Sequence, residues 1–135
     1  MKRLHFSLIL SCVLFCLPAI AEQSSIKPKS QGEVTFISGG VGVDEQNALA
    51  AMRGEFNLSL LFSIQGSAEY LSGVKVYIDD SSGNTFLETT SDGPKLFAKL
   101  KPGNYTVTAD RDGQVIKKSA NVRVKQRTSL SFTWP

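Results

Sequence analysis

From Glu55 to the end of the chain, apolar residues recur at every second position, and this period constrains the fold most. A period of two sends successive side chains to opposite faces of a strand, so each segment has one buried and one solvated face. Turn residues, such as Pro102-Gly103 and Asp112-Gly113, separate the segments at about 8–12-residue intervals. Residues 55–135 therefore predict an all-β domain, a seven-stranded antiparallel β-sandwich.

The core of this sandwich is predicted from the apolar members of each alternation. They are Phe56, Leu58, Leu60, Phe62, Ile64, Val74, Val76, Ile78, Leu96, Ala98, Leu100, Tyr105, Val107, Ala109, Ala120, Val122, Val124, Leu130, Phe132 and Trp134. A further strand is expected at residues 85–90, where the sequence pattern does not show which face is buried. Tyr77 and Phe97 fall on outward positions, and we expect residues 39–54 to cover Phe97.

The segment before the sandwich predicts a second, smaller unit. Residues 33–54 contain a short apolar strand, a Gly-rich turn and one short N-terminal helix of about ten residues, which Asp44 is placed to cap. Leu49 and Met52 lie three apart, so one face of this helix is able to pack. Residues 22–32 are polar and predict a flexible tether.

Residues 1–21 have the features of a signal peptide. Lys2 and Arg3 precede an apolar run at 8–17, and Ala19 and Ala21 supply the small residues that signal peptidase requires. The run is shorter than the ~20 residues that span a bilayer, which argues against an uncleaved anchor. We therefore expect cleavage after Ala21, export to the periplasm, or secretion as the alternative, and no transmembrane segment in the mature chain.

Cleavage would remove the residues on which most catalytic and metal chemistry depends. His5, Cys12 and Cys16 all lie in the leader, and the formal charge would fall from +3 to +1 as Lys2 and Arg3 leave. Triads with histidine, cysteine nucleophiles and the usual zinc ligands are then excluded. We expect no enzyme activity, no cofactor and no metal site. A hydrolase that uses paired carboxylates is the third and weakest hypothesis.

Paired acids in two predicted turns leave calcium binding as an alternative to ordinary turn chemistry. Asp79-Asp80 and Asp110 with Asp112 are the two pairs, and neither continues into an EF-hand loop. Aspartate is common in turns because its carboxylate accepts hydrogen bonds from nearby backbone N–H groups. The turn interpretation is favoured.

Three segments are similar to a known family. They are Val-Lys-Val-Tyr-Ile-Asp-Asp at 74–80, Ser-Asp-Gly-Pro at 91–94 and Leu-Lys-Pro-Gly-Asn-Tyr-Thr-Val-Thr-Ala at 100–109. Together they resemble the carboxypeptidase regulatory-like domain, over about residues 55–134. The resemblance implies a transthyretin-like (prealbumin-like) sandwich with a non-catalytic role, here as a small exported bacterial protein that carries the domain alone.

Charge is distributed unevenly along the chain. Residues 95–135 hold nine basic residues against two acidic ones, whereas residues 22–94 hold four against ten. The candidate basic binding face is Lys99, Lys101, Arg123 and Lys125, expected to point outward on strands. Such a face attracts anionic envelope polysaccharide, lipid head groups or another envelope protein, and no nucleic acid is expected. The favoured interpretation of these residues by themselves is that they only keep the surface soluble and block edge pairing.

The leading functional hypothesis is therefore an exported non-catalytic module that binds or supports another envelope component. The alternative is a structural or surface protein that associates with a protein partner through a β-edge or a sheet face.

Overall fold

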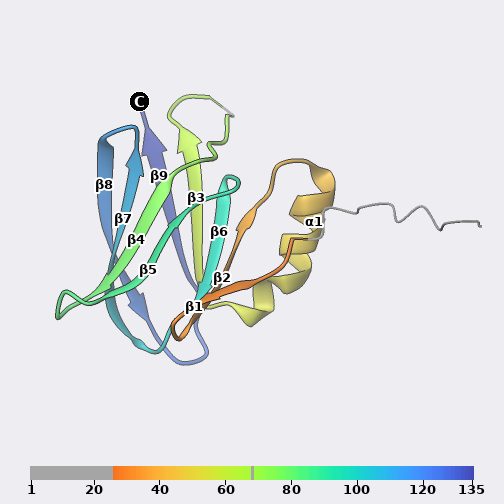
Figure 1. The fold of residues 1–135 in the computed structure, drawn as a ribbon. Coiled ribbons are helices and arrows are strands. Elements are labelled where there is room, and N and C mark those ends of the chain that lie inside the picture. The colour runs from red at the N-terminus through yellow and green to blue at the C-terminus, as the bar shows by residue number, and fades with distance from the viewer. Residues whose placement is uncertain (1–25, 68) are drawn as a thin grey trace, which may run out of the picture.

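The computed structural model describes residues 26–67 and 69–135, which form two packed sheets and a helix outside them (Figure 1). The elements are β1 (Lys29–Gln31), β2 (Val34–Gly39), α1 (Val43–Met52), the 3-10 helix η1 (Arg53–Glu55), β3 (Leu58–Ile64), β4 (Lys75–Asp80), β5 (Thr85–Thr90), β6 (Lys95–Lys99), β7 (Gly103–Arg111), β8 (Gln114–Val122) and β9 (Thr128–Trp134). The signal peptide expected at residues 1–21, with Ala19 and Ala21, lies outside the described residues.

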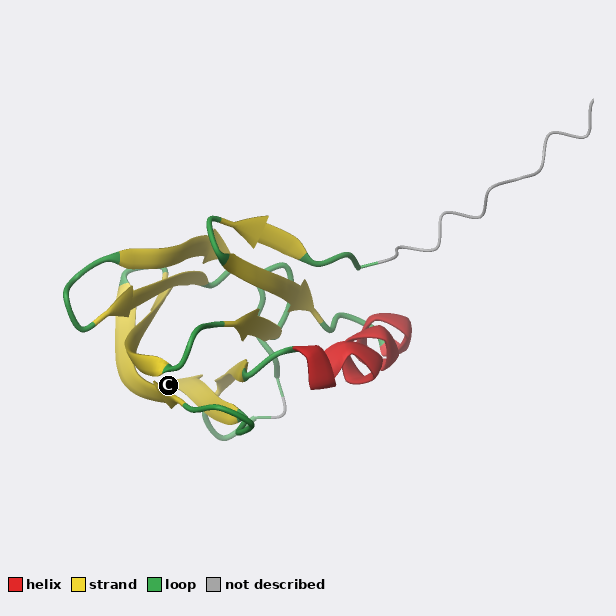
Figure 2. Ribbon diagram, turned by 90° about the horizontal axis from the view of Figure 1, so that it is seen from below, coloured by secondary structure: helices red, strands yellow, loops and turns green. Residues whose placement is uncertain are grey.

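The two sheets have different strand orders. The first, here called sheet A, has the order β1-β2-β6-β3-β9, and sheet B has the order β5-β4-β7-β8. Neighbouring strands are antiparallel except β3 and β9, which run parallel from the Leu58–Thr128 pair to the Ile64–Trp134 pair. Seen from below, α1 lies to one side of the strands (Figure 2). In the described residues, no helix has the length and apolar character needed to cross a bilayer.

The structure confirms an all-β sandwich with one short helix and corrects its strand count. The described residues form nine strands, of which β3–β9 are the seven expected and β2 is the apolar strand expected before them. β2 joins sheet A beside β6. The unexpected strand is β1, which lies inside the predicted tether and pairs with β2 across a turn at Gly32-Glu33. Its three side chains are all exposed, so its sequence shows no apolar alternation from which a strand could be predicted.

Most side chains predicted to face inward do form the core between the sheets. Trp134, Phe62 and Phe132 are among its largest fully buried members, and the Phe62 and Phe132 ring centroids lie 5.8 Å apart. Leu87 fills the core from β5, whose face the sequence left open. Ile64 and Leu130 are only half-buried. The prediction for Val124 is wrong: β8 ends at Val122, and Val124 is 69 % exposed in the loop that follows.

A second apolar cluster joins α1 to the outer face of sheet A. It contains Ile37, Leu49, Phe56 and Phe97, with Met52 packed against it. This confirms that the 39–54 segment covers Phe97, and it corrects Phe56, which lies in this cluster and not between the sheets. The expectation that Asp44 caps this helix is wrong. The N-cap of α1 is Gly42, at φ 86°, with no side-chain cap, and Asp44 lies in the first turn.

Side-chain hydrogen bonds close both long sides of the sandwich. On one side the Gln31 amide bonds the backbone of Glu88 on β5 twice, donating to its oxygen at 3.2 Å and accepting from its nitrogen at 2.7 Å. On the other side, Trp134 Nε1 donates to the Gln114 oxygen of β8 at 2.9 Å. Backbone groups at the edges of sheet B are therefore occupied by side chains of sheet A.

Candidate anion-binding groove

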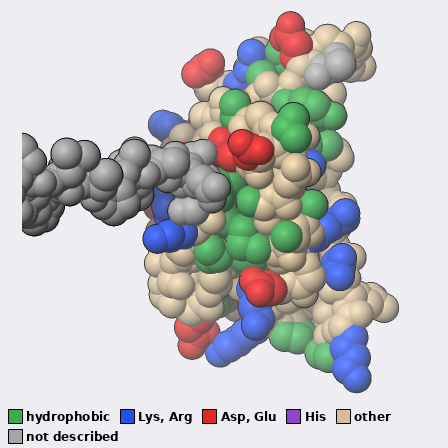
Figure 3. Space-filling view, turned by 90° about the vertical axis from the view of Figure 1, so that its right-hand side faces the viewer, with side chains coloured by type: hydrophobic (Ala, Val, Ile, Leu, Met, Phe, Trp, Pro, Cys, Tyr) green, Lys and Arg blue, Asp and Glu red, His purple; other side chains and the backbone are tan. Residues whose placement is uncertain are grey.

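A groove of about 630 Å³ opens at the end of the sandwich where β6 ends and where η1 leads into β3. Its cationic lining residues are Lys99, Arg123, Lys125 and Arg127, and Glu55 is the one carboxylate among its lining residues. We call this the basic groove. Figure 3 views the face on the α1 side, where Lys and Arg side chains gather toward the lower end.

The loop between β8 and β9 supplies three of the four cations. It runs from Arg123 to Arg127, and the Gln126 nitrogen donates to the Arg123 oxygen at 3.4 Å. Lys125 has φ 60°, in the left-handed region. A residue with a Cβ is uncommon there, and the conformation costs on the order of 1 kcal/mol. The loop therefore holds its basic residues in a bent, slightly strained backbone.

Asn57 ties together the three segments that carry the groove. Its side-chain Nδ2 donates to the Leu100 oxygen at 2.6 Å, and its Oδ1 accepts from the Leu100 nitrogen at 2.9 Å. Its backbone nitrogen donates to the Ala98 oxygen at 3.2 Å, and its oxygen accepts from the Thr128 nitrogen at 2.8 Å. The end of β6, the start of β3 and the start of β9 are thus held at fixed positions beneath the cations.

The structure brings together three of the four predicted basic residues. Lys99, Arg123 and Lys125 line the groove, although Arg123 and Lys125 lie in a loop and not on a strand as expected. Lys101 does not join them, because its Nζ pairs with Glu33 at 2.9 Å. That hydrogen bond raises the pKa of Lys101. Arg127 was missed, and only its place in the basic C-terminal stretch pointed to it.

The groove cations are free of ion pairs within the described part of the chain. The two ion pairs there join Lys29 to Asp92 at 3.7 Å and Lys101 to Glu33. Four positive charges therefore share one groove with a single negative one. Each exposed charge attracts a ligand weakly through water, but a cluster of one sign raises the local concentration and the association rate of anions.

The paired acids serve as turn residues. Asp80 Oδ1 accepts from the nitrogens of Ser82 at 2.9 Å and Asn84 at 2.8 Å. The bond from the Asn84 backbone is the largest cause of a lowered Asp80 pKa. Thr85 donates to Asp79 at 2.6 Å, and the Gly113 nitrogen donates to Asp110 at 2.8 Å. Across residues 26–67 and 69–135, no three His, Cys, Asp or Glu side chains lie close enough to hold a metal ion.

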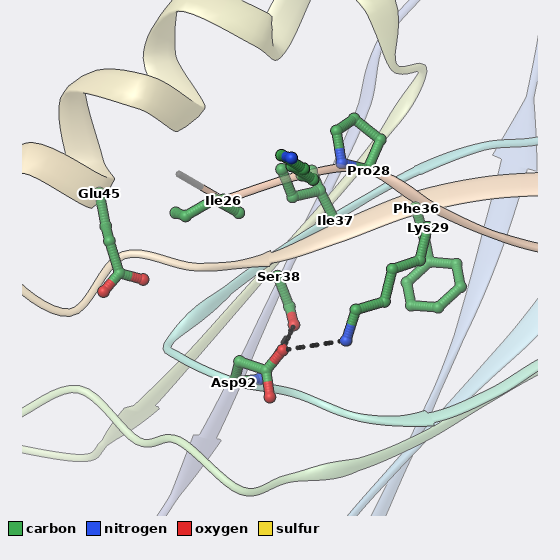
Figure 4. Close-up of a pocket in the computed structure, with 9 residues that line it drawn as sticks. Ile26, Pro28, Lys29, Phe36, Ile37, Ser38, Glu45 and Asp92 are labelled. Carbon is green, nitrogen blue, oxygen red and sulfur yellow. Dashed lines mark hydrogen bonds and ion pairs between the residues drawn. The ribbon is translucent and has the colours of Figure 1, made fainter. Parts of the chain in front are cut away.

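A second cavity, of about 370 Å³, lies between β1 and α1 (Figure 4). Ile26, Pro28 and Ile37 give it an apolar lining. The Asp92 carboxylate forms an ion pair with Lys29, and the Asp92 backbone nitrogen donates a hydrogen bond to Ser38 Oγ at 2.9 Å. Because Lys27 and Lys29 are offset by Glu45 and Asp92, this cavity has no charge preference, and the basic groove is the stronger candidate site.

Comparison of the sequence with models of known protein families and with curated proteins finds no match in either set. The fold and the groove define a class only: a two-sheet β-sandwich with one outer helix and a basic groove at one end.

Proposed function

We propose that this chain is an exported, non-catalytic β-sandwich module that binds an anionic component of the cell envelope through the basic groove. The observation that carries the proposal is the convergence of Lys99, Arg123, Lys125 and Arg127 on one groove with one carboxylate. Export rests on the leader at residues 1–21. Lack of catalysis rests on the loss of every histidine and cysteine with that leader.

We further propose that the sandwich is a transthyretin-like, carboxypeptidase regulatory-like domain. Support comes from the Leu-Lys-Pro-Gly-Asn-Tyr segment at 100–105. Tyr105 points into the core, and its hydroxyl donates to the Lys101 oxygen at 2.7 Å, which fixes the turn between β6 and β7. The same arrangement, a tyrosine hydroxyl bonded to backbone a few residues upstream, recurs at corners of antiparallel sandwiches.

The alternative of association through a strand edge has less support. β8 is the longest edge strand, but its Gln114 and Asn121 oxygens accept hydrogen bonds from Trp134 and Thr128 of β9. Lys118 donates to the Ser131 oxygen across the same gap. An incoming strand would have to displace these bonds before it could pair.

The test compares two variants that lose the same number of charges. Arg123→Gln/Lys125→Gln/Arg127→Gln neutralises the loop, and Lys27→Gln/Lys75→Gln/Lys117→Gln neutralises three exposed lysines elsewhere. The probes are sodium polygalacturonate, as an acidic polysaccharide, and vesicles that contain phosphatidylglycerol. We expect the loop variant to bind the polysaccharide about tenfold or more weakly at low salt and with a shallower salt dependence, and the control to change about twofold or less.

Three results would decide against the proposal or refine it. Equal weakening in both variants would mean that overall charge, and not the groove, attracts the ligand. Absence of binding to either probe by the parent chain would overturn an anion-binding function. Glu55→Gln removes the one carboxylate of the groove, so it should strengthen binding by a few-fold, and weaker binding would contradict the electrostatic argument.

A further inference from the structure

We infer that the ligand of the basic groove is a linear acidic polysaccharide that continues into a second groove on the outer face of sheet A. This inference rests on the proposed function and names the class of ligand. The second groove, of about 240 Å³, lies between α1 and strands β3, β6 and β9. Arg53 and Lys95 supply its cations.

The two grooves are neighbours on sheet A, because the same elements line both. Lys99 of β6 lines the basic groove, and Lys95, on the same face of that strand, lines the second one. Arg127 before β9 lines the basic groove, while Ser129 and Ser131 line the second. Alternate residues of a strand share one face, and four residues span about 13 Å. Phe97, which lies between Lys95 and Lys99 on that face of β6, is buried under α1. The exposed row that leads from one groove to the other is therefore the one on the β9 side, through Arg127, Ser129 and Ser131.

The helical side of the path is also continuous. η1 places Arg53 in the second groove and Glu55 in the basic groove, with Gly54 between them. The guanidinium of Arg127 lies against Gly54. A cation therefore stands at the junction of the two grooves, and an anionic chain that passes from one to the other remains next to positive charge.

The lining of the second groove matches the chemistry of a sugar acid. Ser59, Ser129 and Ser131 offer hydroxyl groups, and half-buried Leu61 offers an apolar surface. A pyranose ring presents hydroxyls at its rim and C–H groups on its face, and an acidic sugar adds a carboxylate. The side chains that line this groove include no carboxylate. At about 240 Å³, the volume is below the ~300–1,000 Å³ of typical small-ligand pockets, so it suits one unit of a longer chain.

A lipid head group requires only one of the two grooves. Its charges are confined to one end of the molecule, whereas a polysaccharide repeats its charge along its length. The path over sheet A, with cations at Lys95, Arg53, Arg127 and Lys125, therefore favours a polymer. The prediction that separates the two is a dependence of affinity on chain length.

The experiment measures binding of galacturonate oligomers of two and eight units by titration calorimetry. The parent chain should bind the octamer more than about tenfold more tightly than the dimer. Arg53→Gln/Lys95→Gln should reduce that ratio by about fivefold or more and leave dimer affinity within about twofold. The variant keeps the statistical advantage of a longer chain, so the difference from the parent reports the second groove alone. Lys75→Gln/Lys117→Gln is the charge-matched control.

The outcomes distinguish this inference from the proposed function. If the parent and Arg53→Gln/Lys95→Gln give the same length ratio, the second groove is not used, and the inference fails while the basic groove stands. If neither oligomer binds but phosphatidylglycerol vesicles do, the ligand is a lipid, and the polysaccharide inference is overturned. If neither oligomers nor vesicles bind, the proposed function fails as well. Urea unfolding of each variant identifies any loss that comes from misfolding.

Discussion

Replacement of Asn57 by alanine tests whether the basic groove is held in place by one side chain. The Asn57 amide makes two hydrogen bonds to the backbone of Leu100, one in each direction. These bonds extend the pairing of β6 beyond its last residue, Lys99, and connect it to the start of β3. Asn57→Ala removes both bonds and leaves the Leu100 nitrogen and oxygen without partners at a residue only 5 % exposed.

The expected loss of stability follows from those two backbone groups. A buried donor or acceptor left unsatisfied costs about 1–3 kcal/mol. Asn57 itself is half-buried, so water reaches the gap in part and the lower end of the range applies to each group. We expect the free energy of unfolding to fall by about 2–4 kcal/mol. Asn57→Asp should lower the free energy of unfolding by roughly half as much, since its carboxylate accepts a hydrogen bond from the Leu100 nitrogen but cannot donate one to the Leu100 oxygen.

Urea unfolding followed by far-UV circular dichroism provides the measurement, with the slope checked for constancy between variants. Asn104→Ala is the matched control, because Asn104 is exposed on β7 and its side chain makes no hydrogen bond within the described residues. It should change stability by about 0.5 kcal/mol or less. A loss for Asn57→Ala no larger than that of the control would refute the role given to the amide.

Three further predictions concern other fixed points of the fold. Gly93→Ala should destabilise the chain by about 2–3 kcal/mol in thermal unfolding, because its Cβ would clash with the backbone carbonyl of Gly39. Burial and the Asp80 charge raise the pKa of Tyr105 above its usual 10.0. Tyr105 therefore contributes stability that is complete below pH 10.0 and is lost as pH rises through the folded pKa. Tyr105→Phe should not show this loss of stability at alkaline pH, and at pH 7 its free energy of unfolding should be about 1 kcal/mol lower than that of the parent. Asp80, whose pKa is lowered, contributes stability above pH 3.8, its usual pKa, and this stability is lost as pH falls through the folded pKa. A titration of its carboxyl group by NMR should find a midpoint below 3.8.

The parts of the fold that could be predicted are those where one face of a strand is buried. Each of β3, β4 and β7 repeats this contrast over several residues, so the alternation identified both the strand and its inner face. β1 has no such contrast, because all three of its side chains are exposed on an edge. β1 pairs with β2 through its backbone, and the Gln31 amide also bonds β5, a segment 57 residues away in the sequence. Local pattern holds no information about such a contact.

The candidate site was only partly predictable for the same reason. Charge composition identified the basic stretch, but extending the β8 alternation placed Val124 in the core and Arg123 and Lys125 on a strand. The chain turns there at Lys125, a residue type that gives no turn signal. The contact that removes Lys101 from the groove is with Glu33, far upstream. Arg127 reaches the groove because β9 pairs in parallel with β3, and a parallel partner outside the hairpin order is not readable from spacing.

The groove separates the residues that hold the fold from the residues that carry charge, and this separation makes the binding proposal testable. Asn57, the parallel β3–β9 pairing and the Tyr105 hydroxyl fix the backbone around the groove. Within the described residues, the side chains of Lys99, Arg123, Lys125 and Arg127 take part in no ion pair and no hydrogen bond of their own. Neutralising the loop cations therefore removes no native ion pair or hydrogen bond, and it relieves the repulsion among clustered like charges. Arg123→Gln/Lys125→Gln/Arg127→Gln should unfold at the same or a slightly higher urea concentration than the parent. A marked loss of stability in this variant would instead assign these three cations to the fold and remove the reason to regard the groove as a binding site.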